Sequence, residues 1–213
     1  MGKEKINNLL IVGYTGSGKS TLANVLSGTD DFEEYSSQIF KKKEFIWKGT
    51  KYNVVDTNGI GKEITCEKIE EIIHLIPEGI SQILFVIDGK FTTEGILGNF
   101  ILESDIADYI TIVRTKFSNF KNESACKKDR EDLCKKSEKI CKLCENIVYV
   151  DNPPTKIAVY DEDDEETIEI NKKRRERSKK ILLERLEKVC HKLKMWDNLR
   201  PVILQFLKTT NYI

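Results

Sequence analysis

The stretch Gly13-Tyr14-Thr15-Gly16-Ser17-Gly18-Lys19-Ser20-Thr21 decides the fold of this chain. It fits the pattern G-x-x-x-x-G-K-[ST], which forms a phosphate-binding loop where a strand precedes it and a helix follows it. The apolar run LLIV at residues 9–12 predicts a buried strand, and the amphipathic run LANVL at residues 22–26 predicts a helix. We therefore interpret the stretch as a phosphate-binding loop and not as an ordinary glycine-rich turn.

The residue types of this loop suit the chemistry of phosphate binding. Gly16 and Gly18 let the backbone wrap closely around phosphate oxygens, while backbone N–H groups and the helix N-terminus favour negative charge. Lys19 adds a positive charge for the outer phosphates, and the Ser20 hydroxyl is the expected magnesium ligand. The candidate nucleotide-binding residues are Gly13, Tyr14, Thr15, Gly16, Ser17, Gly18, Lys19, Ser20 and Thr21.

Length and charge limit the classes of function. The chain has 213 residues, enough for one sizeable domain or for one domain with an appendage. Lys+Arg and Asp+Glu both total 35, so the net charge favours neither a nucleic-acid-binding nor a strongly anionic protein. No apolar run approaches the roughly 20 residues of a transmembrane helix, and the N-terminus does not resemble a signal peptide. We expect a cytoplasmic protein that binds no nucleic acid.

Strands and helices alternate along the chain, which is typical of a mainly parallel sheet covered on both faces. Six strands are predicted, at residues 9–12, 39–47, 51–55, 81–88, 109–115 and 147–150. Helices are predicted at residues 22–26, 64–76, 92–104 and 122–145. The second and third strands form a hairpin through the turn at residues 48–50. The predicted fold class is α/β: a P-loop NTPase domain at residues 1–155, with a six-stranded, mainly parallel sheet flanked by helices, and a C-terminal helical extension at residues 156–213.

The C-terminal extension contains three distinctive segments. Residues 161–166 (DEDDEE) are all acidic and favour the start of a helix, because their charge complements the helix dipole. The basic run at residues 172–180 is interpreted as a solvated helix face, with a nucleic-acid or nuclear-import patch as the alternative. Apolar residues then recur at steps of four and three: Leu182, Leu186, Val189, Leu193 and Trp196. This seam either packs back on the domain or pairs with another chain.

Four of the six cysteines cluster in the predicted helix at residues 122–145: Cys126, Cys134, Cys141 and Cys144. Cys141-x-x-Cys144 has the spacing of a zinc pair, but no second such pair or nearby histidine completes a ligand set. The cysteines lie on or beside the apolar stripe of the helix, which is typical of buried thiols. We interpret them as structural thiols, with metal or redox chemistry as the alternative.

A second nucleotide motif follows the third predicted strand. Asp56-Thr57-Asn58-Gly59 has the form D-x-x-G and begins 37 positions after Lys19. In GTPases such an aspartate holds magnesium through water, and the glycine N–H senses the terminal phosphate. The order and spacing of the two motifs are more specific than either motif alone. Asp56 is a candidate metal ligand, and Gly59 is a candidate nucleotide-binding residue.

Three segments together resemble the AIG-type, or immune-associated (GIMAP), GTPases, which are relatives of the chloroplast-import receptor GTPases and the septins. They are GYTGSGKST at residues 13–21, WKGTKYNVVDTNGI at residues 47–60 and KFTTEG at residues 90–95. The resemblance covers about residues 9–152 and implies a septin-like domain that binds GTP or GDP with Mg²⁺ and dimerises in the GTP-bound state. It also places Ser37 where the family's switch threonine reaches magnesium, because Trp47 matches the family's tryptophan before the third strand.

The chain departs from a standard GTPase at two positions. Ile60 follows Gly59 where Ras-like enzymes have a glutamine that orients the attacking water, so intrinsic hydrolysis should be slow. The base-reading pattern [NT]-K-x-D matches residues 115–118 (TKFS), with Ser118 in place of the aspartate that binds guanine. Lys116 still suits a position over the base, but guanine preference should be weaker than in a standard GTPase.

Asp151 and Asn152 come directly after the last predicted strand. Either residue could supply the polar contact that Ser118 lacks, as the family's asparagine does at this place. The alternative is a simple strand-ending turn before Pro153.

The sequence therefore favours a guanine-nucleotide-binding protein, a slow GTPase switch regulated by nucleotide-dependent dimerisation. The homodimer would form through the nucleotide face or through the C-terminal helix. The alternative is a non-hydrolysing, nucleotide-bound interaction module. No catalytic residue is identified, although Glu94 and Lys62 are candidates for completing the facing site in a dimer.

Overall fold

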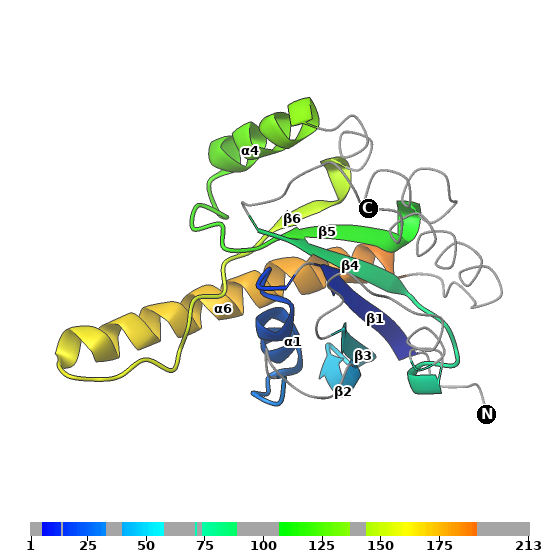
Figure 1. The fold of residues 1–213 in the computed structure, drawn as a ribbon, viewed down its shortest axis with the longest axis horizontal. Helices are drawn as coiled ribbons and strands as arrows, with labels where there is room; N and C mark the ends of the chain where they lie inside the picture. Colours follow the sequence, from blue (N-terminus) through cyan, green and yellow to red (C-terminus); the bar gives the residue numbers. More distant parts are fainter. Residues whose placement is uncertain are drawn as a thin grey trace.

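A six-stranded sheet forms the centre of the computed structural model, which describes residues 6–13, 15–32, 40–57, 71, 74–88, 107–136 and 144–190 (Figure 1). The strands are β1 (Ile6–Gly13), β2 (Phe40–Trp47), β3 (Thr50–Thr57), β4 (Gln82–Ile87), β5 (Ile110–Arg114) and β6 (Ile147–Tyr149). Their order is β2-β3-β1-β4-β5-β6, and only β2 runs antiparallel to its neighbour. The predicted α/β fold class and the mainly parallel sheet are confirmed.

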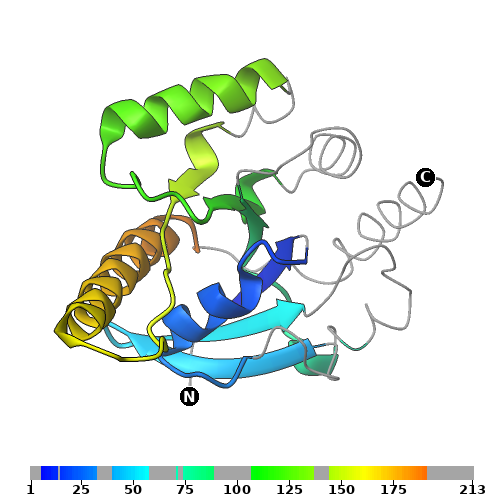
Figure 2. The same ribbon diagram turned by 60° about the vertical axis from the view of Figure 1, so that its left-hand side comes forward.

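Helices cover both faces of this sheet (Figure 2). They are α1 (Lys19–Ser27), α4 (Glu123–Lys136) and α6 (Glu162–Val189), with short 3-10 helices η1 (Ala107–Tyr109) and η2 (Cys144–Asn146). One hydrophobic core lies between one face of the sheet and helices α1 and α6. A second hydrophobic core lies on the opposite face of the sheet and includes Leu133 of α4. Burial on both faces explains why β1 and β4 contain the continuous apolar runs LLIV at residues 9–12 and ILFVI at residues 83–87. The helix predicted at residues 92–104 and most of the one at 64–76 lie outside the described residues.

The predicted hairpin between β2 and β3 is confirmed. Lys48 and Gly49 form its turn, and both have positive φ, 47° and 77°. Positive φ at both central residues matches the twist of the flanking strands, and Gly49 adopts it without strain. The hairpin is also fixed from outside, because the Trp47 indole N–H and the Lys48 ammonium both donate to the Glu187 carboxylate of α6, at 3.0 and 3.1 Å.

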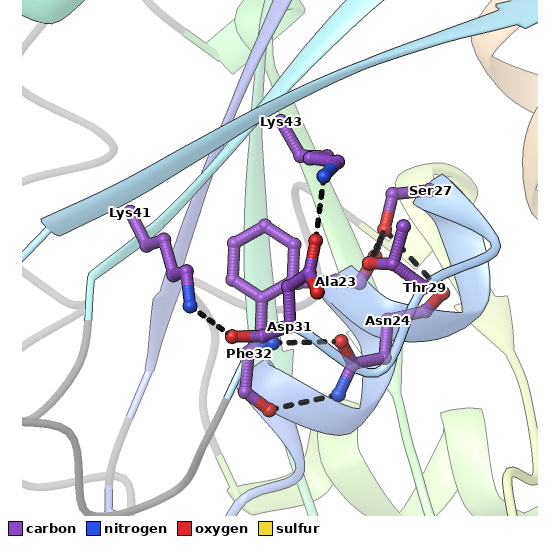
Figure 3. Close-up of polar contacts among 8 residues, drawn as sticks. All are labelled: Ala23, Asn24, Ser27, Thr29, Asp31, Phe32, Lys41 and Lys43. Atoms are coloured by element: carbon purple, nitrogen blue, oxygen red, sulfur yellow. Dashed lines mark hydrogen bonds and ion pairs between the residues drawn. The ribbon is translucent and has the colours of Figure 1, made fainter.

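The end of α1 anchors the chain where it leaves the helix (Figure 3). The Asn24 side-chain amide donates to the Phe32 carbonyl oxygen at 2.8 Å and accepts from the Phe32 N–H at 2.9 Å. Phe32 is buried, and the neighbouring Asp31 pairs with Lys43 of β2 at 2.6 Å. These contacts fix the residue that precedes segment 33–39, and β2 begins directly after that segment.

Helix α6 is 28 residues long and has two different halves. Its N-cap, Asp161, accepts from the Asp164 N–H at 3.1 Å, and the acidic residues of its first turn complement the dipole as predicted. The buried residues Leu182, Leu183 and Leu186 all lie in the second half and join the core with α1. The described part of the apolar seam therefore packs back on the domain; Leu193 and Trp196 lie outside the described residues.

Among the described residues, the cysteines form no disulfide. Cys126 and Cys134 are partly buried on α4, Cys144 lies in η2, and Cys190 is buried beside α6. Within the described residues, no group of three or more His, Cys, Asp or Glu side chains is placed to hold a metal ion, and Cys141 lies outside them. The partial burial of Cys126 and Cys134 on α4 is what the interpretation as structural thiols predicts. In the described part of the chain, no helix has the length and apolar character needed to cross a bilayer.

Candidate functional site

The topology of the sheet brings the predicted motifs to one edge. β1 lies between β3 and β4, so the strand order changes direction at β1, and ligands of open α/β sheets bind outside the carboxyl ends of strands at such a point. The phosphate-binding loop leaves the carboxyl end of β1, and Asp56 lies near the carboxyl end of β3. Thr115 and Asp151 lie just beyond the carboxyl ends of β5 and β6.

Two glycines of the phosphate-binding loop are required by the backbone. Gly13 has φ 152°, and a Cβ there would lie 2.4 Å from the Val86 carbonyl oxygen of the neighbouring strand. Gly18 is the N-cap of α1, with φ 94° in the left-handed region that glycine tolerates. The loop therefore passes directly from β1 into α1, whose first two residues, Lys19 and Ser20, are buried.

Asp56 faces the start of α1. Its carboxylate is fully buried, and both oxygens lack a hydrogen-bond partner. Burial raises the pKa of the Asp56 carboxyl, and the nearby Ser20 hydroxyl and Lys19 ammonium oppose this shift. A buried carboxylate without partners beside a hydroxyl suits a hard cation such as Mg²⁺, which prefers oxygen ligands. Asp56 and Ser20 thus fit the predicted metal site.

We expect Asp56→Asn to stabilise the nucleotide-free protein, because asparagine keeps the shape of the side chain without a buried charge. The predicted rise in melting temperature is about 2–4 °C, as for about 1 kcal/mol in a chain of this size. The pKa of Asp56 in the folded protein lies above the ordinary value of 3.8, which applies in the unfolded chain. As the pH rises from 3.8 to the folded-state pKa, the carboxyl ionises in the unfolded chain first, and the parent protein therefore loses stability. The difference should therefore be present at neutral pH and shrink near about pH 4.

Calorimetry at both pH values, with nucleotide and magnesium removed, measures this effect. Asp132→Asn on the exposed surface of α4 is the matched control. A lower melting temperature for Asp56→Asn at neutral pH would contradict the prediction, because it would mean that the carboxylate stabilises the empty site.

The segment after β5 is attached to the phosphate-binding loop. The Thr115 hydroxyl donates to the Ser17 carbonyl oxygen at 2.6 Å and lies 3.0 Å from the Ile87 carbonyl oxygen. The Lys116 ammonium donates to the Gly16 carbonyl oxygen at 2.6 Å. Lys116 therefore lies across the phosphate-binding loop, where the sequence predicts a lysine over the base. Thr115 was not among the predicted site residues, although it occupies the first position of the base-reading pattern.

Helix α6 forms hydrogen bonds with both predicted base-reading segments, the one after β5 and the one after β6. The Arg174 guanidinium donates to the Ser118 carbonyl oxygen at 2.8 Å and to the Asp151 carboxylate, with Nε at 2.9 Å. The Ser178 hydroxyl lies 2.9 Å from both the Asp151 N–H nitrogen and its carbonyl oxygen. Arg174 and Ser178 thereby hold the segments after β5 and β6 in one arrangement.

The interpretation of the basic run as a solvated face is wrong for part of it. Arg175 donates to the Pro153 carbonyl oxygen at 2.7 Å, and Lys179 lies over the Phe45 ring, where burial lowers its pKa. The other basic residues of the run are exposed: Lys172, Lys173, Arg177 and Lys180. Arg174 and Ser178 precede Leu182 at steps of four, so the helical period places them on the apolar face; this signal was present in the sequence.

The structure distinguishes between the two residues after β6. The Asp151 carboxylate is already paired with Arg174, whereas both polar atoms of the Asn152 side chain are buried without a hydrogen-bond partner. An unpaired buried amide is costly unless a ligand or water satisfies it. Asn152 is therefore the better candidate for a contact with the base.

The described residues bring most of the predicted set to this edge of the sheet. Like the polar side-chain atoms of Asp56 and Asn152, the Ser17 hydroxyl is buried without a hydrogen-bond partner. Several predicted residues lie outside the described part of the chain: Tyr14, Ser37 and Gly59 of the nucleotide site, and Ile60, Lys62 and Glu94 of the hydrolysis and dimer hypotheses.

One family model and several solved structures match this chain. The family model described as AIG1 family matches residues 7–192. Toc33 from Arabidopsis thaliana, in a structure with Mg²⁺ and GMPPNP, has 16% identity and a TM-score of 0.50 over 83% of this chain and 82% of that chain. Era from Aquifex aeolicus has 25% identity and a TM-score of 0.45 over 69% of this chain and 51% of that chain. A search of curated protein sequences gives no match.

Proposed function

Since this chain belongs to the AIG1 family, we propose that it is a guanine-nucleotide-binding switch that hydrolyses GTP slowly. The observation that carries the proposal is the set of unsatisfied polar side chains at the carboxyl edge of the sheet. Ser17, Asp56 and Asn152 each contain a buried polar atom without a partner, at the predicted phosphate, metal and base positions. One bound Mg²⁺–nucleotide would satisfy all three.

Each part of the site has a proposed task. Backbone N–H groups of the phosphate-binding loop and the Lys19 ammonium bind the phosphates. Ser20 and Asp56 hold Mg²⁺, which neutralises charge on the phosphate oxygens when bound. Lys116 covers the base, and Asn152 contacts its polar edge. Asp151 acts indirectly, because Arg174 and Ser178 hold it against the segment that contains Ser118.

Slow hydrolysis follows from the residue after the second motif. Ile60 has no polar atom that could orient an attacking water, and phosphoryl transfer depends on positioning and charge. A facing subunit can supply the missing group, and this is what the resemblance to AIG-type GTPases implies. We therefore propose that GTP promotes dimerisation through the nucleotide face. The rival interface on the apolar seam is disfavoured, because Leu182 and Leu186 are buried within the domain.

Single-turnover GTP hydrolysis measured against protein concentration tests this proposal, with light scattering in GDP and in a non-hydrolysable GTP analogue. We expect the rate per protomer to rise with concentration, and dimers to form with the analogue but not with GDP. Phosphate release that is absent at every concentration would instead support the non-hydrolysing interaction module. Equal dimerisation with both nucleotides would contradict assembly through the nucleotide face.

A further inference from the structure

The N-terminal half of α6 projects beyond the sheet and α1 (Figure 1). All buried residues of this helix lie at or after Ser178, so residues 162–177 contribute none to the core. Three of the four exposed large apolar side chains in the described residues lie in or next to this half: Val159, Tyr160 and Ile170, exposed by 49, 88 and 47%. Ile170 is the one of these three that lies within the helix, and its exposure leaves it available for contact with another molecule.

One face of the projecting half carries an ordered set of charges, which we call the stripe. It consists of five exposed residues at steps of three and four: Asp163, Glu166, Ile170, Lys173 and Arg177. Such steps place all five on one side of a helix. Both acids precede Ile170 and both bases follow it, so the charge of the stripe reverses about its centre.

The stripe faces away from the domain. Four side chains of α6 that contact the preceding segment or the core are on another face: Asn171, Arg175, Ser178 and Leu182. Arg174, one turn after Ile170, borders the stripe and binds Asp151 and Ser118. Within the described part of the chain, the four charged side chains of the stripe form no ion pair. Their neighbours Lys172 and Lys180 are paired with Glu169 and Glu184, at 2.6 and 3.9 Å.

We propose that the stripe binds the stripe of a second copy of this chain, with the two helices antiparallel and a two-fold axis at Ile170. Asp163 of one copy then lies opposite Arg177 of the other. Glu166 lies within about 1.5 Å along the axis of Lys173 of the second copy, the rise of one residue. Symmetry repeats both ion pairs, and the two Ile170 side chains meet at the centre.

Charge also determines the direction of pairing. Parallel helices in the same register would place acids against acids and bases against bases, which disfavours that arrangement. In the antiparallel arrangement the contact from Asp163 to Arg177 spans about 21 Å of helix. The two domains then lie at opposite ends of the helix pair, because all buried residues of each α6 lie at or after Ser178.

The interface should be weak and sensitive to salt. Exposed ion pairs each contribute little and are screened by salt, and the apolar contact is small. We expect dimers at high protein concentration and low ionic strength, with at least about a tenfold loss of affinity at high salt. The association does not require nucleotide, so it is separate from the proposed function.

Complementary charge reversals test the proposal by sedimentation velocity on the full chain with GDP. One variant, Asp163→Lys with Glu166→Lys, has an all-basic stripe; the other, Lys173→Glu with Arg177→Glu, has an all-acidic stripe. We expect each variant alone to be monomeric where the parent dimerises, and an equal mixture of the two to form dimers. Circular dichroism checks that α6 remains helical, because lysine near a helix N-terminus is unfavourable.

Matched controls on exposed residues of α4 carry the same changes in charge: Glu123→Lys with Glu131→Lys, and Lys127→Glu with Lys128→Glu. They should dimerise like the parent. A parent that stays monomeric at every concentration and salt would overturn the proposal. Dimers that survive both stripe reversals, or that are lost equally in the α4 controls, would overturn it too.

Discussion

We expect Lys19→Ala to raise the dissociation constants for GTP and GDP at least about 100-fold, equivalent to about 2.7 kcal/mol. The lysine is buried at the first position of α1, next to the phosphate-binding loop and near the Asp56 carboxylate. Charge-assisted hydrogen bonds to phosphate contribute about 1.5–3 kcal/mol each. Lys116, also beside the loop, already donates to the Gly16 carbonyl oxygen and pairs with Asp88. Titration of each nucleotide by calorimetry measures the loss.

A second variant separates binding from folding. Lys19→Met retains the apolar stem of the side chain and should keep the melting temperature near that of the parent, while losing affinity to the same extent. Lys128→Ala on the exposed face of α4 is the control for loss of one positive charge. If Lys19→Ala binds within a few-fold of the parent, the assignment of the phosphate site is wrong.

Much of the fold could be predicted because its signals are local. The phosphate-binding motif requires a strand before it and a helix after it, and β1 and α1 lie there. The hairpin turn at Lys48 and Gly49 is likewise visible in the sequence as a glycine between two strand-like runs. The relative order of the strands then follows from the fold class, which places Asp56 beside Ser20.

The support of the base-reading segments was not predicted, because it depends on contacts between residues distant in sequence. Arg174 meets Ser118 and Asp151, which precede it by 56 and 23 positions. Composition alone presents Arg174 as one member of a basic run, and its neighbours Lys173 and Arg177 are indeed exposed. The helical period places Arg174 in line with Leu182, but only the packing of α6 against the end of β6 shows which residues Arg174 contacts.

The same contacts determine how the base can be read. Arg174 fixes the backbone of Ser118, and Lys116 and Thr115 fix the same segment to the phosphate-binding loop. The Ser118 side chain itself is exposed. An aspartate introduced at this position would therefore lie on a backbone that is already held, and little ordering would be needed for it to bind guanine.

We expect Ser118→Asp to increase the preference for GTP over ATP by about tenfold or more, because a charged bidentate contact contributes about 1.5–3 kcal/mol. We expect Asn152→Ala to decrease the same preference, because it removes the unpaired amide proposed to contact guanine. The parent should lie between the two variants. Competition of each unlabelled nucleotide against fluorescent GDP gives the ratio of dissociation constants for all three proteins.

Two control variants test whether the effect of Ser118→Asp comes from its charge or its size, and whether Asp151 contacts the base or only positions the segment. Ser118→Asn adds a similar volume without charge and should raise the preference less than Ser118→Asp does. Asp151→Asn weakens the pairing with Arg174, so it should reduce affinity for both nucleotides more than it changes their ratio. A parent that discriminates by several orders of magnitude, unchanged by Asn152→Ala, would mean that backbone groups read guanine and that neither side chain has the proposed role.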